Sequence, residues 1–211
     1  MFQEKKHFIF QKYVLPSTQP ISIYKYSNMK KILIVTGDAG ESYETLYAKH
    51  RFEEAGYQSV IAAPSVKRLN LVIHDFEPGW DTYVERKGYL VESDIAFADV
   101  NTADYEAILL IGGRAPEYLR NSTRVVDIVK EFNKAKKYIF AICHGIQILV
   151  TADLVNKKRI TCYEHVKFEV EACGGKYIGK HQAVKSGKIV TGQTWQSHPE
   201  FYRLVFECLG K

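Results

Sequence analysis

The sequence predicts an α/β protein in which helices cover both faces of a mostly parallel sheet. Continuous apolar runs of about four to six residues, typical of buried parallel strands, alternate along the chain with longer stretches in which apolar residues recur every three or four positions. The 211 residues are 46% hydrophobic and include only 14 Gly and 6 Pro. This composition excludes collagen-like and low-complexity chains and suits one sizeable domain.

In the first half of the chain the pattern becomes regular after Met29. Gly56 supplies a stop signal for the first helix. Residues 64–104 contain loop-forming residues, and a polar–apolar alternation near 89–96 predicts short antiparallel strands. The elements expected here are strands at 32–35 and 57–63 and a helix over 42–55.

In the second half, apolar residues at three- and four-residue spacing predict a helix whose buried face includes Val125, Ile128 and Phe132. A strand that runs directly into Cys143 and Gly145 is followed by another helix. The elements expected here are strands at 107–111, 138–142, 159–163 and 188–191, helices around 125–135 and after 145, and a final helix from 199.

Residues 1–28 are expected to be an extension outside the domain formed by 29–211, either loosely packed or disordered, and Met29 is a candidate start. They carry +3 of the formal net charge of +5. Because this excess does not lie on a folded face, we expect no nucleic-acid partner. Charged and polar residues interrupt every apolar stretch of the extension, so a secretory signal is not expected.

Several site classes are not supported by the residue pattern. The apolar runs are far shorter than the roughly 20 residues that span a bilayer, so no membrane association is expected. The four cysteines, at 143, 162, 173 and 208, form neither a Cys-x-x-Cys pair nor a disulfide framework, which favours reduced thiols and a cytoplasmic location. The histidines have no metal-ligand spacing, and we expect no metal.

The segment Ala141-Ile142-Cys143-His144-Gly145 has the layout of a nucleophile elbow. In such an elbow a tight turn between a strand and a helix holds the nucleophile out at the carboxyl edge of the sheet, and small flanking residues permit close backbone approach. The amino end of the following helix favours a thiolate. Cys143 is therefore the expected nucleophile, although a small buried core cysteine is the alternative.

The pattern offers several partners for this sulfur and leaves alternatives for each. His144 is a candidate base only if the elbow turns its ring back toward the sulfur, because neighbouring helical side chains diverge. Gly112-Gly113 ends a neighbouring strand and is either an oxyanion-binding backbone or a simple turn. Glu41 follows the first strand, so it projects from the same edge or serves as a charge at a helix start.

The sequence resembles the ThiJ/PfpI superfamily over nearly all of residues 30–210. The resemblance is carried by three motifs in the family's order and spacing: Glu41-Ser42-Tyr43-Glu44, then Gly112-Gly113-Arg114-Ala115-Pro116-Glu117, then the elbow at 141–147. It is greatest with the PfpI-like branch and its plant glyoxalase-like members. The resemblance implies a flavodoxin-like three-layer sandwich with a nucleophile elbow.

The same resemblance implies roles for individual residues. Cys143 would be the nucleophile, and a protonated Glu41 would donate a hydrogen bond to its thiolate. Glu117 of an adjacent subunit would orient His144, which implies a homo-oligomer whose active site is completed across an interface. The backbone at Gly113 and His144 would bind the oxyanion.

The function expected is a cofactor-free, cysteine-dependent enzyme acting on small reactive dicarbonyls, with methylglyoxal converted to lactate, or a related deglycase. Cys143 would attack the aldehyde, and Glu41 or His144 would move the proton. The alternatives are a PfpI-type intracellular cysteine peptidase and an oxidant-sensing chaperone without real turnover. A glutaminase that uses His198 is a further alternative, which requires His198 to lie within hydrogen-bonding reach of Cys143.

Overall fold

The computed structural model describes residues 29–211, and the predicted extension 1–28 lies outside the described part. A seven-stranded sheet runs through the centre in the order β10-β11-β7-β6-β1-β2-β5. Adjacent strands are parallel except for the antiparallel pair β10 and β11. Its strands are β1 (Lys31–Val35), β2 (Gln58–Ala63), β5 (Ile95–Ala96), β6 (Tyr105–Leu110), β7 (Tyr138–Ile142), β10 (Ala183–Ser186) and β11 (Ile189–Gly192).

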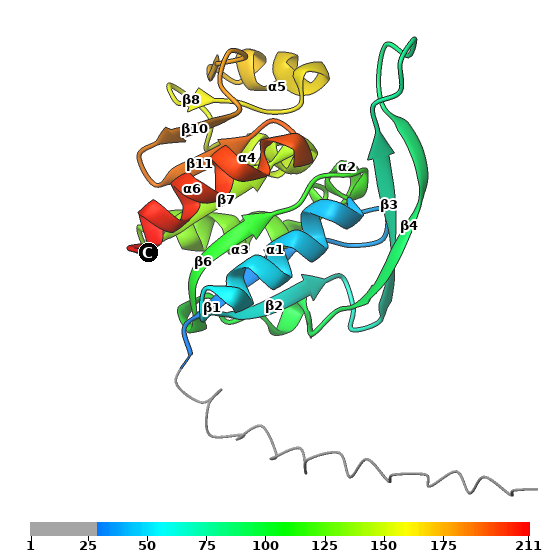
Figure 1. Ribbon diagram of the computed structural model, residues 1–211. Helices are drawn as coiled ribbons and strands as arrows, with labels where there is room; N and C mark the ends of the chain where they lie inside the picture. The colour runs from blue at the N-terminus through cyan, green and yellow to red at the C-terminus, as the bar shows by residue number, and fades with distance from the viewer. Residues whose placement is uncertain (1–28) are drawn as a thin grey trace, which may run out of the picture.

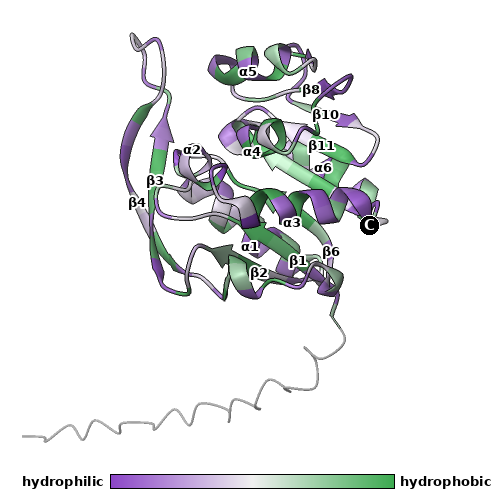
Figure 2. Ribbon diagram, turned by 180° about the vertical axis from the view of Figure 1, so that it is seen from behind, coloured by the Kyte–Doolittle hydropathy of each residue, from purple (hydrophilic) through white to green (hydrophobic). Residues whose placement is uncertain are grey.

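Helices cover both faces of this sheet, which confirms the expected three-layer α/β architecture. The helices are α1 (Ser42–Glu54), α2 (Ala115–Leu119), α3 (Thr123–Lys134), α4 (Ile146–Thr151), α5 (Lys167–Ala172) and α6 (His198–Leu209). Figure 1 shows α1 and α6 on the near face of the sheet, and Figure 2 shows α3 on the opposite face. In Figure 2 apolar colour concentrates on the central strands and alternates with polar colour along α3.

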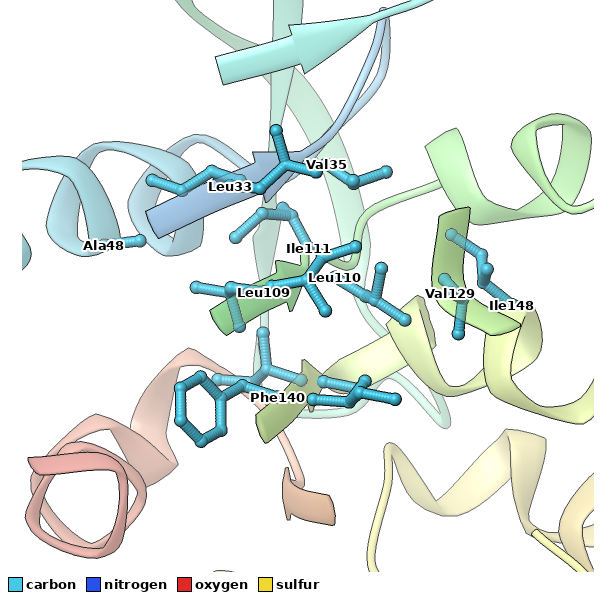
Figure 3. Close-up of a cluster of buried hydrophobic side chains, with 14 of the residues drawn as sticks. Leu33, Val35, Ala48, Leu109, Leu110, Ile111, Val129, Phe140 and Ile148 are labelled. Carbon is cyan, nitrogen blue, oxygen red and sulfur yellow. The ribbon is translucent and has the colours of Figure 1, made fainter. Parts of the chain in front are cut away.

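The core lies between the sheet and both helical layers. The strand residues Leu33, Leu109 and Phe140 are completely buried, as expected for a sheet covered on both faces. Figure 3 shows that Ala48 of α1 lies beside these strands, while Val129 of α3 and Ile148 of α4 pack together beside Leu110. Since the central strands end at one edge, the loops that follow β1, β6 and β7 come together there.

The region 64–104 differs from the expectation of short antiparallel strands near 89–96. It forms a long antiparallel hairpin of β3 (Arg68–Asp75) and β4 (Val84–Glu92), separate from the main sheet. The hairpin is anchored to the loop after β1, where Glu41 bridges Val72. Figure 1 shows it standing along one side of the domain.

The expected strand at 159–163 is also corrected. Only β8 (Arg159–Ile160) is extended, and it pairs with β9 (Lys176–Tyr177) in a second small sheet rather than joining the central one. The short helix α5 packs against β9 and α4. Within residues 29–211, no helix has both the length and the apolar composition that a bilayer crossing requires.

Candidate active site

The elbow at the end of β7 holds Cys143 in a strained backbone conformation. Its φ is 56°, in the left-handed region that non-glycine residues rarely adopt. The turn requires a glycine at 145, because a Cβ there would come within 2.3 Å of the Leu110 carbonyl oxygen. The backbone then passes through a short 3-10 turn (Cys143–Gly145) into α4.

The elbow turns His144 back toward the sulfur, as the catalytic hypothesis requires. Its Nδ1 lies 3.2 Å from Cys143 Sγ. Burial lowers the pKa of His144 to about 4, with smaller contributions from His74 and His165. The imidazole is therefore neutral at neutral pH, and it can exchange a proton with the sulfur through Nδ1.

The carboxyl that contacts the sulfur belongs to Glu44, not to Glu41. Glu44 is completely buried, contacts the Cys143 thiol, and accepts a hydrogen bond from the Gly112 N–H at 2.8 Å. This corrects the role that the family resemblance implied for Glu41.

Glu41 caps the helix on which Glu44 lies. Its Oε2 accepts a hydrogen bond from the Glu44 N–H at 2.6 Å, so the carboxyl turns back onto its own helix. Burial raises the pKa of Glu41 to about 7, opposed by hydrogen bonds from the N–H groups of Glu44, His74 and Tyr43. Of the two positions expected for Glu41, the structure shows the one at the start of a helix.

Glu44 and Cys143 are two acids in contact in a buried place. Burial, reinforced by the charge of Glu41, raises the pKa of Glu44 well above its usual range. Burial likewise raises the pKa of the Cys143 thiol, as does a charge on Glu44, whereas the N–H groups of His144 and Gly113 lower it. Each negative charge opposes the other, so the pair carries at most one charge at neutral pH.

The glycine pair after β6 divides between two roles. The N–H of Gly112 is occupied by Glu44, so it does not serve as an oxyanion donor, which corrects that expectation. The N–H of Gly113 is directed at the sulfur together with that of His144. Gly113 has a φ of 75° and lies against Ala39 and Glu41, where a Cβ would come within 2.5 Å of backbone atoms.

The hairpin covers this site with aromatic rings. Tyr83 stacks on His74 with a centroid separation of 3.7 Å, and both rings approach His144 edge-on, at 5.7 and 6.1 Å respectively. Tyr163 lies 5.1 Å from His144, and its hydroxyl makes a 2.8 Å hydrogen bond with Thr82 Oγ1. Cys143 consequently keeps only 5% of its surface exposed.

Glu117 lies in the first turn of α2, near the aromatic wall that Tyr83, His74 and Tyr163 form over the site. It is exposed, and its negative charge raises the pKa of Tyr83 and opposes the lowering of the pKa of His74. Within residues 29–211 of one chain, no hydrogen bond joins it to His144.

His198 does not belong to the site. Neither of its ring nitrogens has a hydrogen-bond partner among the described residues, so it is not hydrogen-bonded to Cys143. Its ring stacks on Tyr47 of α1 instead, at 4.5 Å. By the stated criterion the glutaminase alternative fails.

The sequence pattern did not predict several residues that surround the sulfur. Glu44 lies in the first family motif, three residues after Glu41, to which the resemblance had assigned the role. His74 and Tyr83 come from the hairpin that was not expected, and His74 Nε2 lies 3.1 Å from Glu85, which in turn pairs with Arg114 at 2.6 Å. Nowhere in the described chain do three His, Cys, Asp or Glu side chains gather as a metal site would require.

Comparison with known proteins identifies the family and the fold. The family model of the DJ-1/PfpI family matches residues 30–208. Protein DJ-1 homolog D of Arabidopsis thaliana is 36% identical over 187 residues, which cover 86% of this chain and 48% of the relative, so the chain spans about half the length of that protein. The crystal structure of Drosophila melanogaster DJ-1beta superposes with a TM-score of 0.72 at 20% identity, covering 87% of this chain and 92% of that one.

Two further relatives match nearly along their whole length. Deglycase PYRAB04690 of Pyrococcus abyssi is 30% identical over 178 residues, covering 83% of this chain and 99% of the relative. YraA of Bacillus subtilis, a candidate cysteine protease, is 35% identical over 165 residues, covering 78% and 89%. The fold and the elbow define a class of three-layer α/β proteins that hold a cysteine on a nucleophile elbow. Within that class, the chain belongs to the DJ-1/PfpI family.

Gly112→Ala tests the close packing of the site. A Cβ at this position would come within 2.6 Å of Cys143 Cβ and 2.7 Å of Glu44 Oε2, so we expect the carboxyl to be displaced from the sulfur. The overpacking should lower the free energy of unfolding by about 1–3 kcal/mol, measured by urea denaturation, and change the rate of Cys143 alkylation.

Gly179→Ala is the matched control, because its Cβ meets only the side chain of Tyr177. An unchanged alkylation rate in Gly112→Ala would show that the packing of Glu44 on Cys143 is looser than described.

Proposed function

We propose that the protein is a cysteine-dependent enzyme that converts small reactive dicarbonyls such as methylglyoxal into hydroxy acids, and that it needs no cofactor. The observation that carries the proposal is the placement of the Cys143 sulfur. It lies on a strained turn, between the buried carboxyl of Glu44 and the Nδ1 of His144 at 3.2 Å. This arrangement is typical of an activated nucleophile.

We infer that Glu44 and Cys143 together carry one negative charge at neutral pH and that this charge lies on the sulfur. Glu44 is neutralised by complete burial and by Glu41, and a neutral carboxyl can donate its proton in a hydrogen bond to a thiolate. The N–H groups of His144 and Gly113 also favour the charged sulfur. With Glu44 neutral, the repulsion that raises the pKa of Cys143 is removed.

The proposed reaction begins when the thiolate of Cys143 attacks the aldehyde carbon. A C–S bond forms and the carbonyl π electrons move to oxygen. The N–H groups of Gly113 and His144, which are directed at the sulfur before attack, would then stabilise that oxygen. The alkoxide takes the proton of Glu44, which leaves a hemithioacetal and a Glu44 carboxylate. The carbon of the hemithioacetal then loses its proton to His144 or to that carboxylate, and the proton returns to the neighbouring carbon. The hydroxyl proton goes back to Glu44 as the thioester carbonyl forms. The resulting lactoyl thioester is hydrolysed by one water, which releases lactate and restores the thiol.

The cover over the sulfur favours a small substrate. Tyr83, Tyr163 and His74 leave Cys143 only 5% exposed, and contacts on both sides of the hairpin loop hold this cover in place. His165 Nε2 lies 2.9 Å from the Asp81 carbonyl oxygen, and Trp195 Nε1 donates to the His74 carbonyl oxygen at 2.9 Å. A three-carbon dicarbonyl requires far less displacement of these rings than a peptide does.

The relatives support two neighbouring activities. The similarity to a Pyrococcus deglycase favours chemistry on carbonyl compounds and their adducts. The similarity to YraA keeps a cysteine peptidase as the second candidate, with Cys143 as nucleophile and His144 as base.

Lactate formation from methylglyoxal without glutathione tests the leading proposal. We expect lactate to form with the purified protein and the rate to fall at least about a thousandfold in Cys143→Ser, because the covalent intermediate is lost. Cys173→Ser, which replaces an exposed cysteine, should leave the rate unchanged.

Three results would contradict the proposal. Equal lactate formation by Cys143→Ser would remove the nucleophile from the reaction. Cleavage of a fluorogenic peptide library, dependent on Cys143 and without lactate formation, would favour the peptidase. Turnover of neither substrate, together with peroxide modification at Cys143 alone, would favour the oxidant sensor.

The pH dependence of Cys143 alkylation by iodoacetamide tests the role of Glu44. In Glu44→Leu we expect the midpoint of the pH–rate profile to rise by about one unit, because the thiolate loses a hydrogen bond from a neutral carboxyl. Glu41→Gln should shift it less, since Glu41 is a cap rather than a contact of the sulfur. A midpoint that falls in Glu44→Leu would show that Glu44 is an ionised carboxylate that repels the thiolate.

We further propose that the active site is completed by a second copy of the chain, whose Glu117 orients His144. Glu117 is exposed and has no hydrogen bond to His144 within its own described chain, while its charge faces the aromatic wall of the site. Its carboxylate is therefore available to a neighbouring molecule.

Mixing two inactive variants tests this arrangement. Cys143→Ser and Glu117→Gln should each form oligomers of mass above 24.2 kDa in light scattering and should each have low activity. When they are dissociated and mixed, some sites receive an intact Cys143 from one chain and an intact Glu117 from the other, so activity should return. A monomeric native protein, or no regain of activity on mixing, would contradict the proposal.

A further inference from the structure

A cleft of about 620 Å³ lies between α1 and α6, away from the cysteine. Figure 1 shows these two helices on the same face of the sheet. Helix α1 contributes Tyr47 and Arg51, at four-residue spacing, and α6 contributes Tyr202, Arg203 and Phe206. None of these residues contacts Cys143 or His144, so the cleft is separate from the site described above. Its volume falls in the range that small-molecule sites occupy.

The described lining of the cleft is cationic. Arg51, Arg203 and Lys211 line it, and no carboxylate side chain is among the described lining residues. Arg51 contacts Glu54 at 3.2 Å, but Glu54 is largely exposed. The salt bridges within residues 29–211 involve neither Arg203 nor Lys211. Arg51 is therefore paired with Glu54, whereas Arg203 and Lys211 have no salt-bridge partner among the described residues.

A buried imidazole at the wall of the cleft lacks partners. His198 is 3% exposed, it borders the cleft, and neither ring nitrogen has a hydrogen-bond partner among the described residues. Burial lowers its pKa to about 4, so at neutral pH the ring keeps one N–H donor and one lone pair. Both nitrogens are shielded from solvent, and the ring stacks on Tyr47, so His198 forms the wall of the cleft rather than a ligand-binding group and can report on what occupies the cleft.

We propose that this cleft binds a small organic phosphate monoester. Two guanidinium groups and an ammonium group match the charge and the oxygen geometry of a phosphate dianion, which arginine binds through two parallel hydrogen bonds. The tyrosine and phenylalanine side chains of the wall provide apolar surface for the organic part.

Calorimetric titration of the full chain with phenyl phosphate in moderate salt tests the proposal. We expect saturable binding, about tenfold weaker in Arg203→Gln, while phenol and inorganic phosphate bind more weakly than phenyl phosphate. Arg203 is exposed, so the substitution should not disturb folding. Lys180→Gln, which removes one exposed positive charge outside the cleft, is the matched control and should bind like the native chain.

Nitrogen NMR of the histidine rings locates the ligand. The His198 signals, identified by their absence in His198→Gln, should shift on saturation with phenyl phosphate, and those of His144 should stay in place. The proposal is overturned if phenyl phosphate does not bind, if Arg203→Gln and Lys180→Gln weaken binding equally, or if the His198 signals do not move. If inorganic phosphate binds as tightly as phenyl phosphate, the claim that the cleft also binds the organic part of the ligand is overturned.

Discussion

The contact between the Glu44 carboxyl and the Cys143 sulfur determines how the loops pack at the carboxyl edge of the sheet. Glu44 is fully buried, so its negative charge is costly, and it lies against Cys143, whose charge is costly for the same reason. The two acids come this close because Gly112 has no side chain between them. The Gly112 N–H also fixes the orientation of the carboxyl.

Three segments that are distant in the sequence converge to make this contact. The loop after β1 starts the helix that carries Glu44, the loop after β6 supplies Gly112, and the elbow after β7 supplies Cys143. Their order in the sheet, with β6 between β1 and β7, brings these loops together. The hairpin then closes the site with Tyr83 and His74, so the sulfur is held in a largely water-excluded place.

The sequence was sufficient for the strands β1, β2, β6, β7 and β11 of the central sheet and for the elbow, because the apolar runs and the small residues around Cys143 are local signals. It was not sufficient to distinguish Glu41 from Glu44. Both carboxylates follow the first strand, and only the geometry of the turn decides that Glu41 folds back onto a helix N–H while Glu44, three positions later, reaches the next loop. The hairpin was missed because a two-stranded ribbon depends on packing with the rest of the domain, such as the bridge from Glu41 to Val72, more than on its own residues.

The location of the single negative charge in the Glu44–Cys143 pair is the central claim, and ultraviolet thiolate absorbance tests it most directly. The measurement is the difference in absorbance between the native protein and Cys143→Ser as the pH is varied. The account predicts excess thiolate absorbance already at neutral pH, with the proton held by Glu44. Excess absorbance that emerges only above the ordinary thiol pKa of 9.0 would show that the sulfur is protonated at neutral pH and would contradict the account.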